Sequence, residues 1–208
     1  MNESQPETRL SLEEMARQLD RAGITWAVFA GAAAAVYGAT RPLTDVDILI
    51  PLAEGDRAAA LFPEALVRRQ EDGAVRGIKL PGFDLVAGLT MRDADATCTV
   101  DLDAQMAARL THHEIAGVTV PGVTVPGVTV PGVTVPVIPP EDNILIKAIW
   151  RRGPEVGKHD WDDVQEMMAH LPELDWAYLR WRADTCGAGQ QAQQALALLK
   201  KLRPAGNV

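Results

Sequence analysis

An apolar segment that runs into a glycine and then into a short helical segment is the feature that most constrains the fold of this chain. Residues 24–30 (ITWAVFA) are apolar and β-prone, which predicts a buried strand that ends at Gly31. Residues 32–37 then have helical composition, and Gly38 is a typical C-terminal stop. The N–H groups of the turn would lie at a helix N-terminus, where anions bind. We therefore expect a phosphate group, in particular a triphosphate, at Gly31 and Ala32.

Two aspartates follow in a segment that alternates acidic and apolar residues. Asp45 and Asp47 lie in residues 45–50 (DVDILI), which predicts a second strand with both carboxylates on one face, roughly 7 Å apart. Two such carboxylates repel each other unless a cation lies between them, and hard oxygen ligands suit Mg²⁺. An isolated D-x-D pattern more often marks a solvated strand edge. The glycine turn upstream favours the metal site.

These residues resemble the signature of the polymerase-beta-like nucleotidyltransferases, which is a hydrophobic residue, Gly, Gly or Ser, a short spacer, and an acid-x-acid pattern. Here it is Ala30-Gly31-Ala32, twelve residues, and Asp45-Val46-Asp47. The string YGATRPLTDVD at residues 37–47 is similar to the minimal nucleotidyltransferases, including the AbiEii-type toxins, and the resemblance adds Arg41 and Thr44 to the expected nucleotide-binding residues. Ala32 replaces the second Gly or Ser of the family, which keeps the N–H group but loses a hydroxyl contact.

The resemblance implies a third carboxylate on a neighbouring strand. Asp84 follows a strand-like segment (residues 75–80) and the turn Pro81-Gly82, and we prefer it for this role. Asp101 or Asp103 is the alternative, although a Val-Asp-Leu-Asp string before helical sequence also suits a helix cap.

A second block of resemblance lies in the C-terminal half. Residues 139–148 (PPEDNILIKA) and 158–164 (KHDWDDV) are similar to the family's helices that close the nucleotide site. The resemblance implies that Lys147 faces the triphosphate and that Asp160 stands near the site. Taken alone, Lys147 would be an ordinary solvated helix lysine, and the acidic cluster at 160–163 a helix N-terminus.

Composition agrees with an enzyme of one large or two small domains in a reducing, cytoplasmic compartment. The chain has 208 residues, of which 47% are hydrophobic, and only two cysteines. We expect neither a secretory signal nor a membrane span, because the N-terminus is polar and the longest apolar stretch is broken by Gly31. The net charge of −8 argues against a large nucleic-acid surface. It leaves room for a small basic patch, for which the candidates are Arg68-Arg69, Arg151-Arg152, Arg180, Arg182 and Lys200-Lys201.

Four consecutive Gly-Val-Thr-Val-Pro copies occupy residues 117–136. Their odd period would turn successive copies to opposite faces of a strand, and each proline lacks an N–H group, so we expect a protruding loop and no regular sheet. This divides the chain into a catalytic core (1–116), a repeat loop (117–136) and a helical C-terminal region (137–208).

The sequence therefore predicts an α+β fold, with a small mixed sheet flanked by helices. The expected activity is transfer of NMP from an NTP to a hydroxyl of a tRNA, a protein or a small molecule. Asp45, Asp47 and Asp84 would hold two Mg²⁺ ions. A role as the toxin of a toxin–antitoxin pair, with a cognate antitoxin as partner, stays open. The alternative is a catalytically silent protein that binds a nucleotide or a partner, for which Ala32 is the best support.

Overall fold

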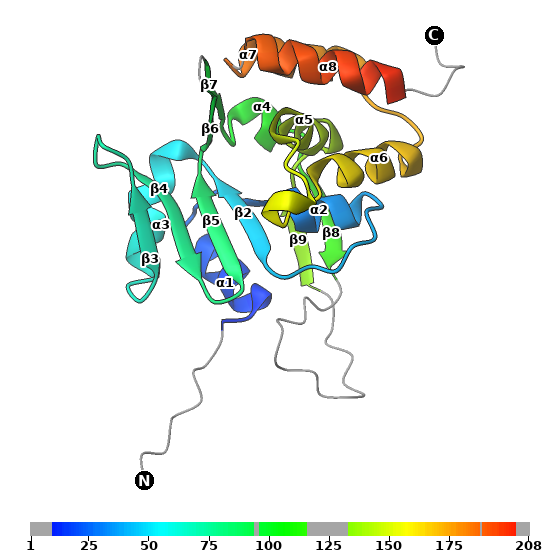
Figure 1. Cartoon of the computed structure of the whole chain (residues 1–208). Helices are drawn as coiled ribbons and strands as arrows, with labels where there is room; N and C mark the ends of the chain where they lie inside the picture. The colour runs from blue at the N-terminus through cyan, green and yellow to red at the C-terminus, as the bar shows by residue number, and fades with distance from the viewer. Residues whose placement is uncertain (1–9, 94–95, 116–132, 188, 203–208) are drawn as a thin grey trace.

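The computed structural model describes residues 10–93, 96–115, 133–187 and 189–202. A seven-stranded mixed sheet forms its centre, in the order β3-β4-β5-β2-β1-β9-β8 (Figure 1). The strands are β1 (Ala27–Phe29), β2 (Val46–Ile50), β3 (Leu66–Arg69), β4 (Val75–Leu80), β5 (Phe83–Ala87), β8 (Thr111–Ile115) and β9 (Val133–Val137), and β6 (Leu89–Asp93) with β7 (Ala96–Val100) forms a separate ribbon. The β2–β5 and β1–β9 pairs are parallel and the others antiparallel, which confirms the mixed sheet.

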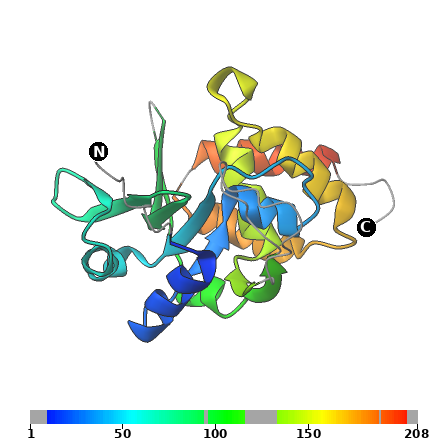
Figure 2. The ribbon, with the colours of Figure 1, turned by 90° about the horizontal axis from the view of Figure 1, so that it is seen from below.

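Helices cover the sheet on both sides, which confirms the α+β class (Figure 2). They are α1 (Leu12–Arg21), α2 (Ala30–Val36), α3 (Gly55–Leu61), α4 (Ala104–Ala107), α5 (Pro140–Trp150), α6 (Asp160–His170), α7 (Trp176–Thr185) and α8 (Gln190–Leu202), with 3₁₀ turns η1 (Leu52–Glu54) and η2 (Pro154–Val156). None of the helices in the described part of the chain is long and apolar enough to cross a membrane.

Local sequence explains several of these elements. Ser11 caps α1 through a reciprocal capping box with Glu14. Pro81-Gly82 joins β4 to β5 in a two-residue hairpin, and Gly82 takes the positive φ (85°) that such a turn needs. β1 is shorter than the sequence suggests, since α2 already begins at Ala30.

Helix α5 is the centre of the C-terminal region, where α6, α7 and α8 pack around it and α2 joins it to the sheet. Most of its residues are buried, including the polar Asp142, Asn143 and Lys147. Buried polar groups need partners, because the loss of hydration is otherwise uncompensated. The contacts of these side chains therefore determine how the helices sit on the sheet.

The last copy of the repeat differs from the expected loop. Val133–Pro136 belong to β9, which lies between β1 and β8. Pro136 is tolerated within this inner strand because β1 is short and pairs with β9 only at Val137. Residues 117–132, which hold the rest of the repeat, lie outside the described residues, and the three-part division of the chain stays a prediction.

We predict that deletion of residues 122–136 leaves the fold intact. The first copy would then supply the same Val-Thr-Val-Pro sequence to β9, and Ala116-Gly117 would join Ile115 to Val118 as a two-residue hairpin connection. Because loop-closure entropy grows slowly with length, the free energy of unfolding should rise by no more than about 2 kcal/mol. Urea unfolding of the variant checks this, and a less stable or unfolded variant would contradict it.

Candidate nucleotide-binding and catalytic site

Backbone register brings two of the expected acids together. β2 and β5 are parallel neighbours, and Asp47 pairs with Asp84 in their register. Asp45 immediately precedes β2, so its carboxylate lies beside the other two at one end of these strands. The sheet itself therefore assembles the three aspartates that the sequence singled out, although they come from segments far apart in the chain.

A lysine that the sequence analysis did not name contacts two of these acids. Lys79 pairs with Asp84 across the β4–β5 hairpin. Its Nζ lies 3.2 Å from Oδ2 of Asp45 and 3.5 Å from Oδ2 of Asp84. The ammonium thus supplies part of the positive charge that three adjacent carboxylates require.

The surroundings of Asp47 disfavour its ionised form. Burial, together with repulsion from Asp45 and Asp84, raises the pKa of Asp47 to about 6. Because this pKa lies above that of an unfolded aspartate, ionisation of Asp47 costs stability, and the cost is fully present above pH 6. An additional positive charge beside Asp47 would remove this cost.

The acids line a cavity of about 400 Å³, which is large enough for a nucleotide. Its cationic lining residues are Arg68, Arg76, Lys79, Arg152 and Lys158. Phe29 and Ala30 close the α2 side, with Trp150 beside Arg152, whose guanidinium carbon lies 3.9 Å from the indole centroid. The cavity therefore combines a small acidic centre with a basic surround, an arrangement suited to phosphate groups and cations together.

The glycine turn has a geometry that the sequence did not reveal. Ala30, the residue before the glycine, takes the positive φ (53°), and its carbonyl oxygen accepts a hydrogen bond from Nδ2 of Asn143 at 3.2 Å. Gly31 lies in the first turn of α2, and Nη2 of Arg41 lies 2.7 Å from the position that a Cβ would take. A side chain at residue 31 would displace the guanidinium of Arg41, so the glycine allows the close approach of Arg41 to α2.

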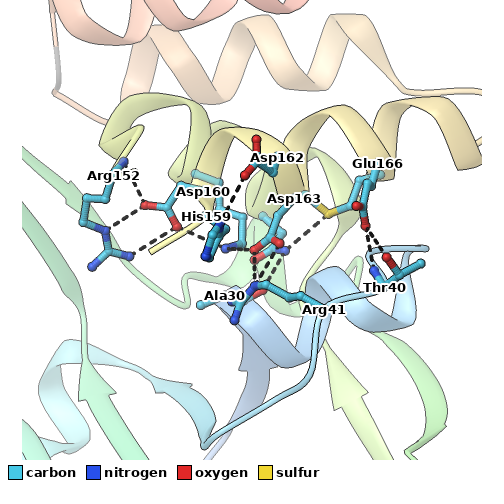
Figure 3. Close-up of polar contacts among 12 residues, drawn as sticks. Ala30, Thr40, Arg41, Arg152, His159, Asp160, Asp162, Asp163 and Glu166 are labelled. Atoms are coloured by element: carbon cyan, nitrogen blue, oxygen red, sulfur yellow. Dashed lines mark hydrogen bonds and ion pairs between the residues drawn. The ribbon is translucent and has the colours of Figure 1, made fainter. Parts of the chain in front are cut away.

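Arg41 belongs to a chain of alternating charges, which Figure 3 shows in part. Its Nε donates to both carboxylate oxygens of Asp163, at 2.9 and 3.1 Å. Lys147 Nζ lies 2.7 Å from Asp163 and 3.2 Å from Asp160, and Arg152 Nε donates to Asp160 at 2.7 Å. Lys147, Asp160 and Asp163 are almost fully buried, so this charge chain fastens α5 and α6 to the loop after α2.

The positions of Lys147 and Asp160 differ from the expectation that they border the nucleotide. Neither lines the cavity, because both are buried against each other between α5 and α6. Gly31, Ala32 and Arg41 also lie behind the lining rather than in it. The sequence does not show whether the ammonium of Lys147 faces the cavity or is buried behind its lining.

Thr44 and the alternative third acids also have defined positions. Thr44 Oγ1 donates to Oδ1 of Asp45 at 3.2 Å, beside the acidic centre. Asp101 accepts from the backbone N–H of Leu52, and Asp103 caps α4 and binds Arg182, so neither lines the cavity. Asp103 is thus a helix cap, which is one of the two roles that the sequence allowed for it.

Sequence reasoning missed the basic lining residues. Lys158 lies in the segment 158–164 that resembles the family, but no role was predicted for it. Arg68 and Arg152 were predicted only as candidates for a basic patch. Lys79 could have been found, since it lies three residues before Gly82 in a predicted hairpin and therefore pairs with Asp84. No signal in the sequence distinguishes Arg76.

The donor set fits a hard divalent cation. Asp45, Asp47 and Asp84 supply only carboxylate oxygens, which are the ligands that such cations prefer. Among the described residues, no three acidic, histidine or cysteine side chains already lie close enough to hold an ion. Binding of an ion by all three carboxylates would therefore require their side chains to move closer together.

Comparison with known proteins gives a family and a fold. The family model described as "Uncharacterised nucleotidyltransferase" matches residues 7–204, and the chain belongs to this family. No curated protein sequence matches the chain.

The chain is also similar to solved structures of nucleotidyltransferases. The solution structure of the antibiotic-resistance factor ANT(2″)-Ia is 12% identical, with 91% of this chain and 89% of that chain covered at a TM-score of 0.50. An antigenic nucleotidyltransferase-like protein from Paracoccidioides brasiliensis is 20% identical over 94% and 91% of the two chains, with a TM-score of 0.44. The lincosamide adenylyltransferase LnuA, bound to lincomycin, is 10% identical over 79% and 100%, with a TM-score of 0.45. The likeness to ANT(2″)-Ia supports the fold alone.

We predict opposite effects of replacing the two lysines near the site. Lys147→Met leaves two buried aspartates without their shared cation and should cost about 3–5 kcal/mol of stability in urea unfolding. Lys158→Met removes an exposed cavity charge and should change stability by less than about 0.5 kcal/mol. Binding of an NTP, measured by calorimetry, should weaken in Lys158→Met. The reverse pattern, with Lys147→Met stable and defective in nucleotide binding, would return Lys147 to the nucleotide site.

Proposed function

We propose that this member of the nucleotidyltransferase family transfers NMP from an NTP to a hydroxyl group in a Mg²⁺-dependent reaction. The observation that carries the proposal is the convergence of Asp45, Asp47 and Asp84 in a cavity with a basic surround. Phosphoryl-transfer sites need this combination, because the reaction depends on positioning and on charge stabilisation.

The cavity residues divide into two roles in this proposal. The three aspartates hold divalent cations, which when bound neutralise phosphate oxygens and lower the pKa of a coordinated hydroxyl. Lys158 and Arg152 bind the triphosphate on the α2 side, where Phe29 and Ala30 complete the cavity lining. Arg41, Lys147 and Asp160 act as positioning residues that fix this side of the cavity.

In the proposed step the acceptor oxygen bonds to the α-phosphorus of the NTP. The bond from that phosphorus to the oxygen bridging it to the β-phosphorus breaks, and pyrophosphate leaves with the bridging oxygen. In this proposal Asp84, which lies on the β4 side of Asp47, receives the hydroxyl proton. Lys158 and Arg152 stabilise the negative charge that accumulates on the leaving pyrophosphate.

A binding protein without catalysis is the second candidate. It is favoured by Ala32, which lacks the family's hydroxyl contact, and by the Lys79 ammonium, which contacts two of the acids. Toxin activity is a further form of the proposed transfer. It would appear as growth arrest on expression that depends on the same aspartates and is relieved by a cognate antitoxin.

We predict that Asp84→Asn abolishes transfer of label from an α-³²P-labelled NTP, because it removes both a proposed cation ligand and the proton acceptor. Loss should be at least about 10³-fold in rate, typical of a group acting in the transition state. Asp101→Asn is the matched control, since Asp101 lies outside the cavity, and it should stay within about threefold of the unaltered chain.

Nucleotide binding by calorimetry shows whether the Asp84→Asn site is intact. If Asp84→Asn retains transfer, or if Asp101→Asn is the variant that loses it, Asp84 is not the catalytic carboxylate. If the unaltered chain binds NTP and labels no acceptor, the binding-protein candidate replaces the enzyme.

A further inference from the structure

The cavity has a second basic wall that the triphosphate does not account for in the proposed function. Arg152, Lys158 and the glycine turn lie on the α2 side of the three aspartates. Arg68 and Arg76 lie on the other side, on β3 and β4, beyond Asp84 in the strand order. The neutral lining residue Gln70 directly follows β3 and also belongs to this second wall.

Two local features of the sheet direct these arginines into the cavity. Gly77 provides space for Arg68, because a Cβ there would lie 2.5 Å from Nη2 of Arg68. The Arg68 side chain can therefore lie across the backbone of β4, and its Nη2 donates to Asp84 at 3.0 Å. The side chain is 58% exposed, so its guanidinium also faces the open cavity.

A β-bulge directs the second arginine. In the β3–β4 register Arg68 pairs with Gly77 and Arg69 pairs with Val75, so that Arg76 is skipped. A bulge of this kind re-aims a side chain, and it places Arg76 in the cavity lining beside Arg68. The next residue on β3, Arg69, instead binds Asp56 of α3 on the opposite face of the sheet.

Arg76 carries an unused donor. Its Nη2 lies 3.5 Å from the exposed Asp72, whereas its Nε is buried and has no hydrogen-bond partner among the described residues. Buried donors are nearly always paired in folded proteins, so the guanidinium of Arg76 has unused hydrogen-bonding capacity while its side chain contributes to the cavity lining. Guanidinium groups bind phosphate oxygens with two parallel hydrogen bonds, which suits a wall of two arginines.

We infer that the acceptor carries a phosphate group next to its reactive hydroxyl, and that Arg68 and Arg76 bind this phosphate. The inference rests on the proposed transfer to a hydroxyl, since it assigns the wall beside Asp84 to the acceptor. An RNA 3′ end and a small sugar phosphate share this chemistry. The two arginines would repel a polycationic acceptor, and no acidic lining residue other than the three aspartates would offset this repulsion.

Transfer assays with matched acceptors test the inference. The complete chain is incubated with Mg²⁺, each α-³²P-labelled NTP in turn, and a hexaribonucleotide, ribose 5-phosphate, ribose or tobramycin. We expect label on the hexaribonucleotide or on ribose 5-phosphate, and these two arms separate a polymer from a small phosphate ester. Ribose should be at least 100-fold poorer in kcat/KM than the phosphate-bearing acceptor, and tobramycin should remain unlabelled. Equal labelling of ribose, or labelling of tobramycin in preference, would overturn the inference.

Substitutions in the second wall then show whether it binds the acceptor or the NTP. Arg68→Ala and Arg76→Ala should each raise the KM of the phosphate-bearing acceptor at least tenfold and leave the KM of the NTP within twofold. Arg69→Ala, which removes the same charge from the same strand on the other face, should leave both within twofold. A rise in the KM of the NTP in place of that of the acceptor would give this wall to the triphosphate and overturn the inference.

A binding measurement separates this inference from the proposed function. Fluorescence anisotropy of a labelled hexaribonucleotide, and thermal stabilisation by ribose 5-phosphate, need no turnover. Binding that is lost in Arg68→Ala and Arg76→Ala, in a chain that transfers no label, would refute the transfer reaction and leave the phosphate site standing. NTP binding without any binding of either phosphate compound would refute the phosphate site and leave the nucleotide site standing.

Discussion

The buried ion cluster of Lys147 with Asp160 and Asp163 is the interaction on which the arrangement of this protein depends. It joins α5 to α6, and through Arg41 and Arg152 it reaches the loop after α2 and the segment that borders the cavity. Burial makes the cluster intolerant of change, because each charge left without its partner would keep its full desolvation cost. The helical region is therefore held in one position relative to the sheet.

The acidic centre depends on a different constraint, which is backbone register. The parallel pairing of β2 with β5 places Asp47 beside Asp84, and the β4–β5 hairpin places Lys79 opposite Asp84. Such positions are set by hydrogen-bonded ladders and not by flexible loops, so the carboxylates are held together despite their repulsion. Burial, together with this repulsion, raises the pKa of Asp47 to about 6. The sheet thus holds the three carboxylates together at the cavity.

Strong local patterns were readable from the sequence, and contacts between distant segments were not. The β4 strand and the turn that joins it to β5 were predicted with correct bounds, because both depend on residues close together in the chain. The resemblance placed Lys147 at the triphosphate, whereas only the packing of α5 against α6 shows that its ammonium is buried. The bulge at Arg76 depends on the register with β3, which no local pattern encodes. The last repeat copy forms a strand because it pairs with β8 and β1. The five-residue period alone does not indicate this pairing.

Thermal unfolding with Mg²⁺, with NTP, and with both shows whether Asp45, Asp47 and Asp84 form a cation-assisted nucleotide site. We expect Mg²⁺ and NTP together to raise Tm by more than the sum of their separate effects, because each completes the binding site of the other. This excess should vanish in the double variant Asp45→Asn with Asp47→Asn. An excess that persists unchanged in the double variant, or additive effects in the unaltered chain, would show that these aspartates do not form such a site.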